Sequence, residues 1–306
     1  MAKRTPKEIT GVIVANITPF LENEEIDYDA LRQHVRWMLD NGIHGLLPCG
    51  STGEHQLLTW EEIQKVYRVC LEEVKEKNII TAVGGAPSTR AAIARCKWYE
   101  DVGVDGFMVP PPAYPASFMQ WQGILKHFND LGDAIETPCM IYNSSFTQGF
   151  LMSAELVARI HRDHPDIYQY YKHADSNIVA LQDVINEWGR DKIKLVAGLN
   201  HNALPMFHLG AKSWLASAGN VFPREVSEII EAVMRGDLKK AEELYWKLWP
   251  FFIKLFRPGV RWQERLKVAL KLLDLPIKNV VRRPRMPLEE AGEEEIRKIL
   301  QDLGKL

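Results

Sequence analysis

The sequence predicts an α/β protein, a (β/α)8 TIM barrel with a C-terminal all-helical extension. Eight short apolar runs alternate with longer amphipathic segments up to residue 222, and this alternation is typical of a parallel sheet. Eight repeats fit a closed barrel better than an open sheet, and no GxGxxG fingerprint follows the first run. We therefore expect a barrel over residues 1–222, with a helical extension over residues 223–306 packed on it.

The predicted strands are the short apolar runs. In chain order they are Gly11–Thr18, Ile43–Pro48, Ile79–Gly84, Gly106–Pro110, Cys139–Asn143, Tyr168–Lys172, Ile193–Gly198 and Lys212–Ala216. In a TIM barrel the chemistry lies where the strands end and the next loops begin. The residues at these eight strand ends are therefore the first candidates for a functional site.

The predicted helices are the amphipathic segments. Those of the barrel are Tyr28–Asp40, Thr59–Lys77, Ser88–Val102, Pro115–Leu131, Ser153–Arg162, Asn177–Trp188 and Asn202–Leu209, and those of the extension are Glu225–Arg235, Leu238–Leu255, Val260–Leu273 and Leu288–Leu300. Thr59 followed by Glu62 is typical of a capping box. Ser153 precedes a helix whose first turn carries Glu155, an acidic residue at the favourable helix end.

Charge and cysteine content exclude several classes of protein. Lys and Arg total 38 and Asp and Glu total 40, a net charge of −2, which argues against a dedicated nucleic-acid-binding protein. The sequence contains no run of about 18 apolar residues, so we predict no membrane span. The N-terminal segment lacks the apolar core of a secretory signal. Cys49, Cys70, Cys96 and Cys139 form no CxxC pair. We predict a cytoplasmic protein with buried thiols.

Lys172 is the most informative candidate for chemistry. It ends a strand rich in tyrosine, and strict alternation places it on the same face as Tyr168 and Tyr170. Burial in such a strand lowers the pKa of a lysine, and a neutral lysine attacks carbonyl groups and forms Schiff bases. The other interpretation is a lysine that reaches the barrel rim or pairs with a carboxylate. Spacing alone leaves both interpretations open.

Two further strand ends carry groups that suit the same chemistry. The phenol of Tyr142 can transfer protons, although a tyrosine at a barrel rim more often packs its ring and binds water. In Gly50–Glu54, two glycines enclose Ser51 and Thr52, so backbone N–H groups can converge on a carboxylate. The alternative for this segment is a tight turn followed by a helix cap. Each pattern alone has low specificity.

We predict neither a metal nor a cofactor. The histidines are scattered, and His161 and His164 lie three apart without the acidic partner of an HExxH motif. No GxSxG segment supports a catalytic serine with a histidine and an acid.

Taken together, the strand ends resemble the dihydrodipicolinate synthase and N-acetylneuraminate lyase family, class I aldolase-type lyases on a (β/α)8 barrel. The resemblance covers about residues 9–300 and rests on order as well as composition. Its pieces are Thr18-Pro19-Phe20, Gly50–Glu54, Tyr142-Asn143, Lys172, Gly198, Ser217–Asn220, Lys267 in a late helix, and Arg283-Pro284 before Pro287-Leu288.

The resemblance implies roles for individual residues. Lys172 forms a Schiff base with pyruvate or a pyruvoyl-type 2-oxo acid, and Tyr142 transfers protons in a relay with the Ser51 hydroxyl. The substrate-binding residues that we predict are Gly50, Thr52, Thr147, Asn200 and Leu215. The implied partners are a small 2-oxo acid and an aldehyde, with no nucleic acid and no membrane. The family also implies a homo-oligomer, a dimer or a tetramer.

Three departures affect the half of the site that binds the second substrate. Lysine-pathway synthases carry an arginine shortly after the catalytic tyrosine, whereas Ser144–Gly149 contains none. They also carry a tyrosine after the fourth strand, where Pro112 stands here and Tyr114 is displaced. After the lysine, the family often has an acid followed by small residues, whereas the order here is His173-Ala174-Asp175-Ser176. Loss of the arginine removes the natural anchor for a carboxylate, so we predict a less charged acceptor.

Three functions follow from these patterns. The main prediction is a Schiff-base lyase or aldolase with a non-standard acceptor. The alternative is 4-hydroxy-tetrahydrodipicolinate synthase of lysine biosynthesis, with the arginine supplied from elsewhere, such as Arg257 or Arg261. The third is a non-catalytic barrel that binds a 2-oxo acid, against which the presence of Lys172, Tyr142 and Ser51 together argues.

Overall fold

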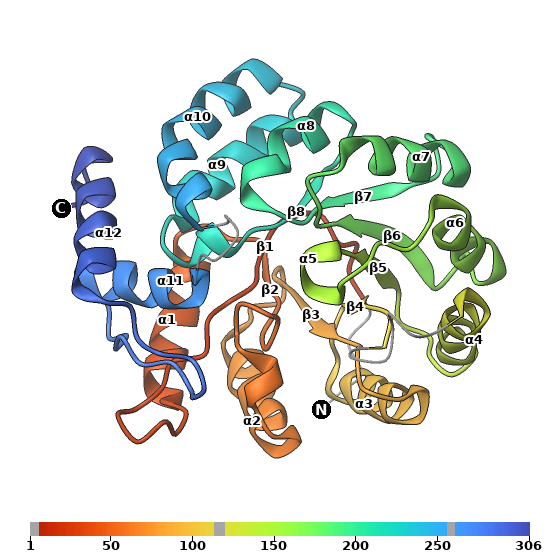
Figure 1. The fold of residues 1–306 in the computed structure, drawn as a ribbon, viewed down its shortest axis with the longest axis horizontal. Coiled ribbons are helices and arrows are strands. Elements are labelled where there is room, and N and C mark those ends of the chain that lie inside the picture. The colour runs from red at the N-terminus through yellow and green to blue at the C-terminus, as the bar shows by residue number, and fades with distance from the viewer. Residues whose placement is uncertain (1–5, 113–119, 256–260) are drawn as a thin grey trace. The chain divides into compact units, whose positions relative to one another are not determined.

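The computed structural model describes residues 6–112, 120–255 and 261–306. The eight strands form a closed parallel barrel in the order of the sequence (Figure 1). They are β1 Gly11–Val14, β2 Gly45–Leu46, β3 Ile79–Val83, β4 Gly106–Val109, β5 Cys139–Asn143, β6 Tyr168–His173, β7 Lys194–Ala197 and β8 Ser213–Leu215. The predicted (β/α)8 fold with a C-terminal helical part is confirmed. All eight strands lie within or beside the predicted apolar runs.

The helices are α1 Tyr28–Asp40, α2 Trp60–Glu73, α3 Thr89–Val102, α4 Trp121–Gly132, α5 Ser145–Gln148, α6 Ala154–Asp163, α7 Ile178–Trp188, α8 Ala203–His208, α9 Pro223–Met234, α10 Leu238–Leu255, α11 Trp262–Leu272 and α12 Glu290–Asp302. Apart from α5, the helices overlap the predicted amphipathic segments, although α2 ends at Glu73 and not at Lys77. The predicted starts at Pro115 and Val260 lie outside the described residues. Thr59 and Glu62 form the predicted capping box at α2, and the Ser153 hydroxyl caps α6. Helix α5 was not predicted, because its four residues are too few to show a period.

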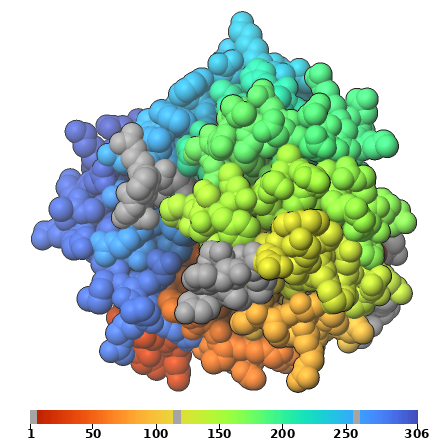
Figure 2. All heavy atoms as spheres, turned by 45° about the vertical axis from the view of Figure 1, so that its right-hand side comes forward, coloured from red at the N-terminus to blue at the C-terminus, as the bar shows by residue number. Residues whose placement is uncertain are grey.

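The chain divides into two compact units. One unit comprises Met1–Ile9 and Ile80–Ser213, and the other comprises Thr10–Ile79 and Trp214–Leu306. The predicted boundary at residue 222 stays a prediction. In the first unit, strands β3 to β7 pair in parallel. Helices α4, α6 and α7 of this unit pack side by side and form one continuous yellow-to-green surface (Figure 2).

The second unit contains β1 and β2, which pair in parallel, together with the first two helices and the C-terminal helices. Helices α9 and α10 pack against each other, as do α11 and α12. The interior of this unit is aromatic: the rings of Phe222 and Phe251 meet edge to face with centroids 4.7 Å apart, and Trp214 meets Phe252 at 5.8 Å. Large buried aromatic surfaces of this kind stabilise the C-terminal helices.

Strand β6 differs from the strict alternation that the sequence suggested. Cys139 pairs with Tyr168 but Met140 pairs with Tyr170, so β6 carries an additional residue, a bulge, at Gln169. The phenol of Tyr168 consequently donates to the Phe128 carbonyl of α4, outside the strands. The prediction that Lys172 shares a face with Tyr168 was therefore wrong, because a bulge shifts the alternation by one residue.

Candidate active site

Lys172 lies at the end of β6 and is only 7% exposed. Its amine lies 3.4 Å from the Met108 sulfur and 3.9 Å from the centroid of the Tyr142 ring. Among the described residues, no carboxylate lies within ion-pair distance of this amine. Burial lowers the pKa of Lys172 to about 7, because the charged form loses its hydration. A large fraction of Lys172 is therefore a neutral nucleophile at neutral pH.

The neighbour of Lys172 across the sheet is Tyr142. The two residues pair in the register of β5 and β6, so their side chains share one face of the sheet. The Thr147 hydroxyl donates a hydrogen bond of 3.0 Å to the Tyr142 phenol oxygen. Burial raises the pKa of Tyr142 above its usual value, although the bond from Thr147 opposes that shift. The phenol is therefore protonated at neutral pH and can act as an acid toward a group held at Lys172.

Helix α5 holds Thr147 in place. The side-chain amide of Gln148 donates to the Tyr142 carbonyl at 3.1 Å and accepts from the Ser144 amide at 3.2 Å. Asp175 accepts hydrogen bonds from both the amide and the hydroxyl of Ser145 at the start of this helix. These bonds to Ser145 help hold the pKa of Asp175 below its usual range, so an anionic carboxylate lies beside α5. The structure thus places Thr147, predicted to bind substrate, directly on the Tyr142 phenol.

The Gly50–Glu54 loop in the second unit follows β2 and is turned back on itself. The Gly53 amide donates to the Gly50 carbonyl at 2.9 Å, and the Thr18 hydroxyl donates to the Gly53 carbonyl at 2.7 Å. A Cβ at Gly53 would lie 2.9 Å from the Asn16 carbonyl oxygen, so this close approach requires glycine. Within the described ranges, the amides of Ser51 and Thr52 donate to no protein acceptor. Two amide donors in one turn can bind an anion.

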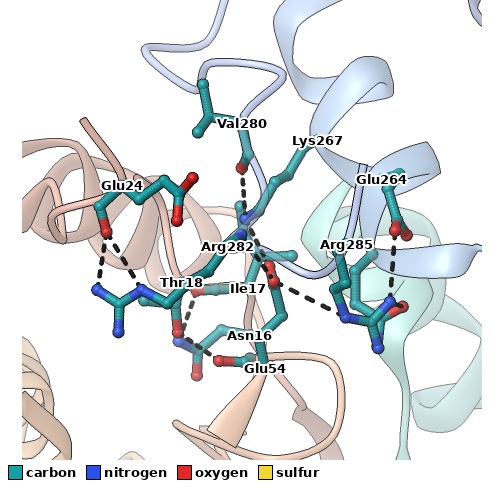
Figure 3. A network of polar contacts seen from close by, with 12 residues as sticks. Asn16, Ile17, Thr18, Glu24, Glu54, Glu264, Lys267, Val280, Arg282 and Arg285 are labelled. Carbon is teal, nitrogen blue, oxygen red and sulfur yellow. Dashed lines mark hydrogen bonds and ion pairs between the residues drawn. The ribbon is translucent and has the colours of Figure 1, made fainter. Parts of the chain in front are cut away.

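Contacts from the C-terminal helices hold this loop. The side-chain amide of Gln263 donates to the Ser51 carbonyl at 3.0 Å. The Lys267 amine lies 2.6 Å from a Glu54 carboxylate oxygen, and both side chains are fully buried (Figure 3). Sequence reasoning gave Lys267 only as part of a resemblance and missed Gln263. No local pattern could have found Gln263, because its partner lies far away in the sequence.

The remaining predicted residues lie at strand ends. Leu215 is the last residue of β8 and is buried. Asn200 begins the short helix Asn200–Asn202 after β7 and is also buried. The structure therefore brings together Lys172, Tyr142 and Thr147 in one unit, and Gly50, Ser51 and Thr52 in one loop of the other.

Arg261 is one of the two arginines named above as an alternative source of positive charge. Its guanidinium binds groups of the C-terminal extension. It donates to the carbonyls of Met286 and Pro287 and forms an ion pair of 2.5 Å with Glu289. The other arginine, Arg257, lies outside the described residues, as does Tyr114.

The four cysteines are free thiols in buried positions, as predicted. Over the ranges that the structure describes, no cluster of histidine, cysteine or acidic side chains could hold a metal ion, and no helix is long and apolar enough to cross a membrane.

The pKa of Lys172 leads to a prediction about pH. We expect the rate of adduct formation with pyruvate to rise with pH and to level off above about pH 7, because only the neutral amine attacks a carbonyl. Timed incubation followed by borohydride reduction and intact-mass analysis measures this rate. A rate that instead kept rising toward about pH 10 would show that the pKa of Lys172 is that of an exposed lysine.

Comparisons with known proteins give a consistent result. The model of the Dihydrodipicolinate synthetase family matches residues 8–303. The chain is 31% identical over 300 residues to 4-hydroxy-tetrahydrodipicolinate synthase of Methanopyrus kandleri, covering 98% of this chain and 97% of the relative. It is 29% identical over 300 residues to the Nitratidesulfovibrio vulgaris (strain DP4) protein of the same name, covering 98% and 100%. The crystal structure of dihydrodipicolinate synthase from Aquifex aeolicus matches with a TM-score of 0.89 at 29% identity, covering 96% and 98%.

Proposed function

Because the chain belongs to the dihydrodipicolinate synthetase family of class I aldolase-type lyases, we propose that Lys172 forms a Schiff base with the 2-oxo group of pyruvate or a pyruvoyl-type acid. The observation that carries this proposal is a buried lysine without a carboxylate partner among the described residues, next to a protonated phenol. An ammonium group in that position is costly, so the environment favours the neutral amine that the reaction needs.

The proposed reaction has an addition step, a dehydration step, a carbon–carbon bond-forming step and a hydrolysis step. The Lys172 amine adds to the 2-oxo carbon, and the resulting carbinolamine loses water to give an iminium ion. Loss of a proton from the adjacent carbon gives an enamine, which attacks the carbonyl carbon of an aldehyde, and hydrolysis then releases the product. Tyr142 donates and recovers the protons of these steps, and Thr147 orients its phenol. The amides of Ser51 and Thr52 hold the substrate carboxylate.

The test of this proposal is covalent trapping. We expect borohydride reduction with pyruvate to add the mass of a reduced pyruvate adduct to one lysine, which peptide mapping assigns to Lys172. A panel of 2-oxo acids then ranks the substrates. Absence of an adduct with every acid, from folded protein, would favour the non-catalytic binding barrel.

For the second substrate, the segment after Tyr142 supports an acceptor without a carboxylate. Ser144–Gly149 supplies amide and hydroxyl groups but no cation, and the anionic Asp175 is bound at the start of α5. A negative carboxylate near Asp175 would be repelled, whereas Asp175 can accept hydrogen bonds from hydroxyl groups. We therefore propose a neutral or hydroxylated aldehyde as the acceptor.

The names of the relatives favour a second candidate. Both relatives described above are 4-hydroxy-tetrahydrodipicolinate synthases, which supports that reaction of lysine biosynthesis for this chain as well. In this case the acceptor is aspartate semialdehyde, and a positive group outside Ser144–Gly149 must bind its carboxylate. Complementation of a diaminopimelate auxotroph distinguishes the two candidates directly.

The two candidates predict opposite acceptor preferences. With pyruvate as donor, we expect kcat/KM for a neutral aldehyde such as glyceraldehyde to exceed that for aspartate semialdehyde by about tenfold or more, because an unpaired carboxylate beside Asp175 costs at least about 1.4 kcal/mol. A coupled assay of pyruvate consumption measures both values. A large preference for aspartate semialdehyde would establish the lysine-pathway reaction instead.

The assembly of the chain is a separate proposal. Homo-oligomerisation as a dimer or tetramer stays a prediction, which light scattering on the purified protein tests.

A further inference from the structure

We infer that Gln263, on helix α11 of the C-terminal extension, is a positioning residue for the substrate carboxylate. This inference rests on the proposed function and deepens it. Gln263 is fully buried and does not belong to the Gly50–Glu54 loop, yet its side chain contacts the backbone of Ser51 directly. The Ser51 carbonyl also accepts from the Glu54 amide at 3.2 Å within the loop, and Gln263 adds a second donor that holds the same peptide group from outside the loop.

The direction of the Thr52 N–H group follows from the geometry of the peptide between Ser51 and Thr52. The side-chain amide of Gln263 donates to the Ser51 carbonyl at 3.0 Å. In a planar trans peptide the C=O and the following N–H point in opposite directions. The Thr52 N–H therefore points away from Gln263 and α11. Because that N–H has no acceptor among the described residues, it is available to an anion, and the bond from Gln263 keeps it aimed there.

The orientation of the Gln263 side chain is itself fixed. Its oxygen accepts a hydrogen bond of 3.1 Å from Arg285, whose guanidinium has only donors. The oxygen of the amide must therefore face Arg285, which leaves the nitrogen to face Ser51. Arg285 is held in turn by Glu264 at 3.4 Å and lies 3.9 Å from Glu54 (Figure 3).

A second contact holds the far end of the same loop. Glu54 has a left-handed backbone with φ of 60°, which is costly for a residue with a side chain. Its carboxylate binds the Lys267 amine at 2.6 Å and accepts from the Arg282 amide at 3.3 Å. Lys267 also donates to the Val280 carbonyl at 2.8 Å (Figure 3). The extension thus fixes the loop at Ser51 and at Glu54, so that the peptide between Ser51 and Thr52 has little freedom to turn.

The test replaces Gln263 with glutamate. The Gln263→Glu change keeps the size of the side chain and an oxygen that can face Arg285, but it replaces the side-chain donor to the Ser51 carbonyl with an anionic oxygen that repels it, and leaves the Glu54 amide as the remaining donor. We expect the pyruvate concentration for half-maximal trapping to rise by about tenfold or more, as for the loss of a buried hydrogen bond, while the trapping rate at saturation changes less than about twofold. Gln263→Met removes the donor without adding charge and is expected to act in the same direction.

Two controls separate positioning from general damage. Lys271→Met, on the exposed side of the same helix, is expected to leave half-saturation unchanged. Hydroxyacetone, a ketone without a carboxylate, is expected to be trapped equally by the wild-type protein and both Gln263 variants, because the Thr52 amide has no anion to bind. The melting temperature of each variant reports its folding.

The outcomes are distinguishable. Unchanged half-saturation by pyruvate in both Gln263 variants would overturn the inference while leaving the proposed function intact. Equal losses with pyruvate and hydroxyacetone would overturn it as well, because they indicate a purely structural role. If the wild-type protein traps neither compound, the proposed function itself fails, and the inference fails with it. A loss confined to pyruvate supports both.

Discussion

Replacing Lys172 with arginine is expected to abolish the pyruvate adduct and reduce turnover to background. A guanidinium group stays charged and cannot form an imine under these conditions, whereas the amine of Lys172 has its pKa lowered to about 7 by burial. Borohydride trapping with intact-mass analysis measures the adduct, and pyruvate consumption measures the turnover.

Two further variants accompany this experiment, one at the same position and one on the neighbouring strand β7. Arginine in a buried position without a carboxylate partner is destabilising, so Lys172→Met, which removes the buried amine, provides a folded variant with the same expected loss. Lys194→Met, at the exposed start of β7, is expected to keep both adduct and turnover. An adduct that persists in Lys172→Met would assign the Schiff base to another lysine and end the proposed mechanism.

Replacing Tyr142 with phenylalanine is expected to lower turnover by roughly a hundredfold or more while pyruvate still binds. The ring that packs against Lys172 is kept, and only the phenol that accepts from Thr147 is lost. Steady-state kinetics measures turnover, and trapping after long incubation shows whether the adduct still forms.

Three companion variants make this result specific. Thr147→Val keeps the phenol but removes the hydroxyl that orients it, so we expect a smaller loss of turnover, which Thr147→Ser restores. Tyr28→Phe removes the phenol of a half-buried tyrosine in α1 and is expected to have no effect. Wild-type turnover in Tyr142→Phe would remove this residue from the mechanism and leave proton transfer to another group.

Local patterns predicted most of the fold because they depend on neighbours in the sequence. The alternation of apolar runs and amphipathic segments located all eight strands, and the capping box at Thr59 is present as predicted. The prediction for the facing of Tyr168 was wrong and helix α5 was missed, and in both cases the cause is a local feature that the hydrophobic pattern does not show. A single additional residue at Gln169 moved Tyr168 to the other face of β6, and α5 is too short to show a period.

The candidate site was predictable only in part. The positions of Lys172 and Tyr142 at strand ends made them candidates, and their pairing in β5 and β6 brings them together. The bond from Thr147 to the Tyr142 phenol and the bond from Gln263 to Ser51 were not foreseen, because each depends on where a side chain is directed after the chain has folded.

The order of strands and helices, and the place of a lysine at the end of the sixth strand, could be predicted from the sequence. The sequence could not decide whether that lysine reacts or is paired, because both choices fit the same spacing. The folded chain shows which lysine is paired, because it buries two lysines in different surroundings. Lys267 is paired with Glu54, a carboxylate 213 residues away in the sequence, whereas Lys172 is buried beside a sulfur and an aromatic ring. Burial without a paired charge is what makes an amine neutral and nucleophilic, and only the folded chain determines which lysine has that environment.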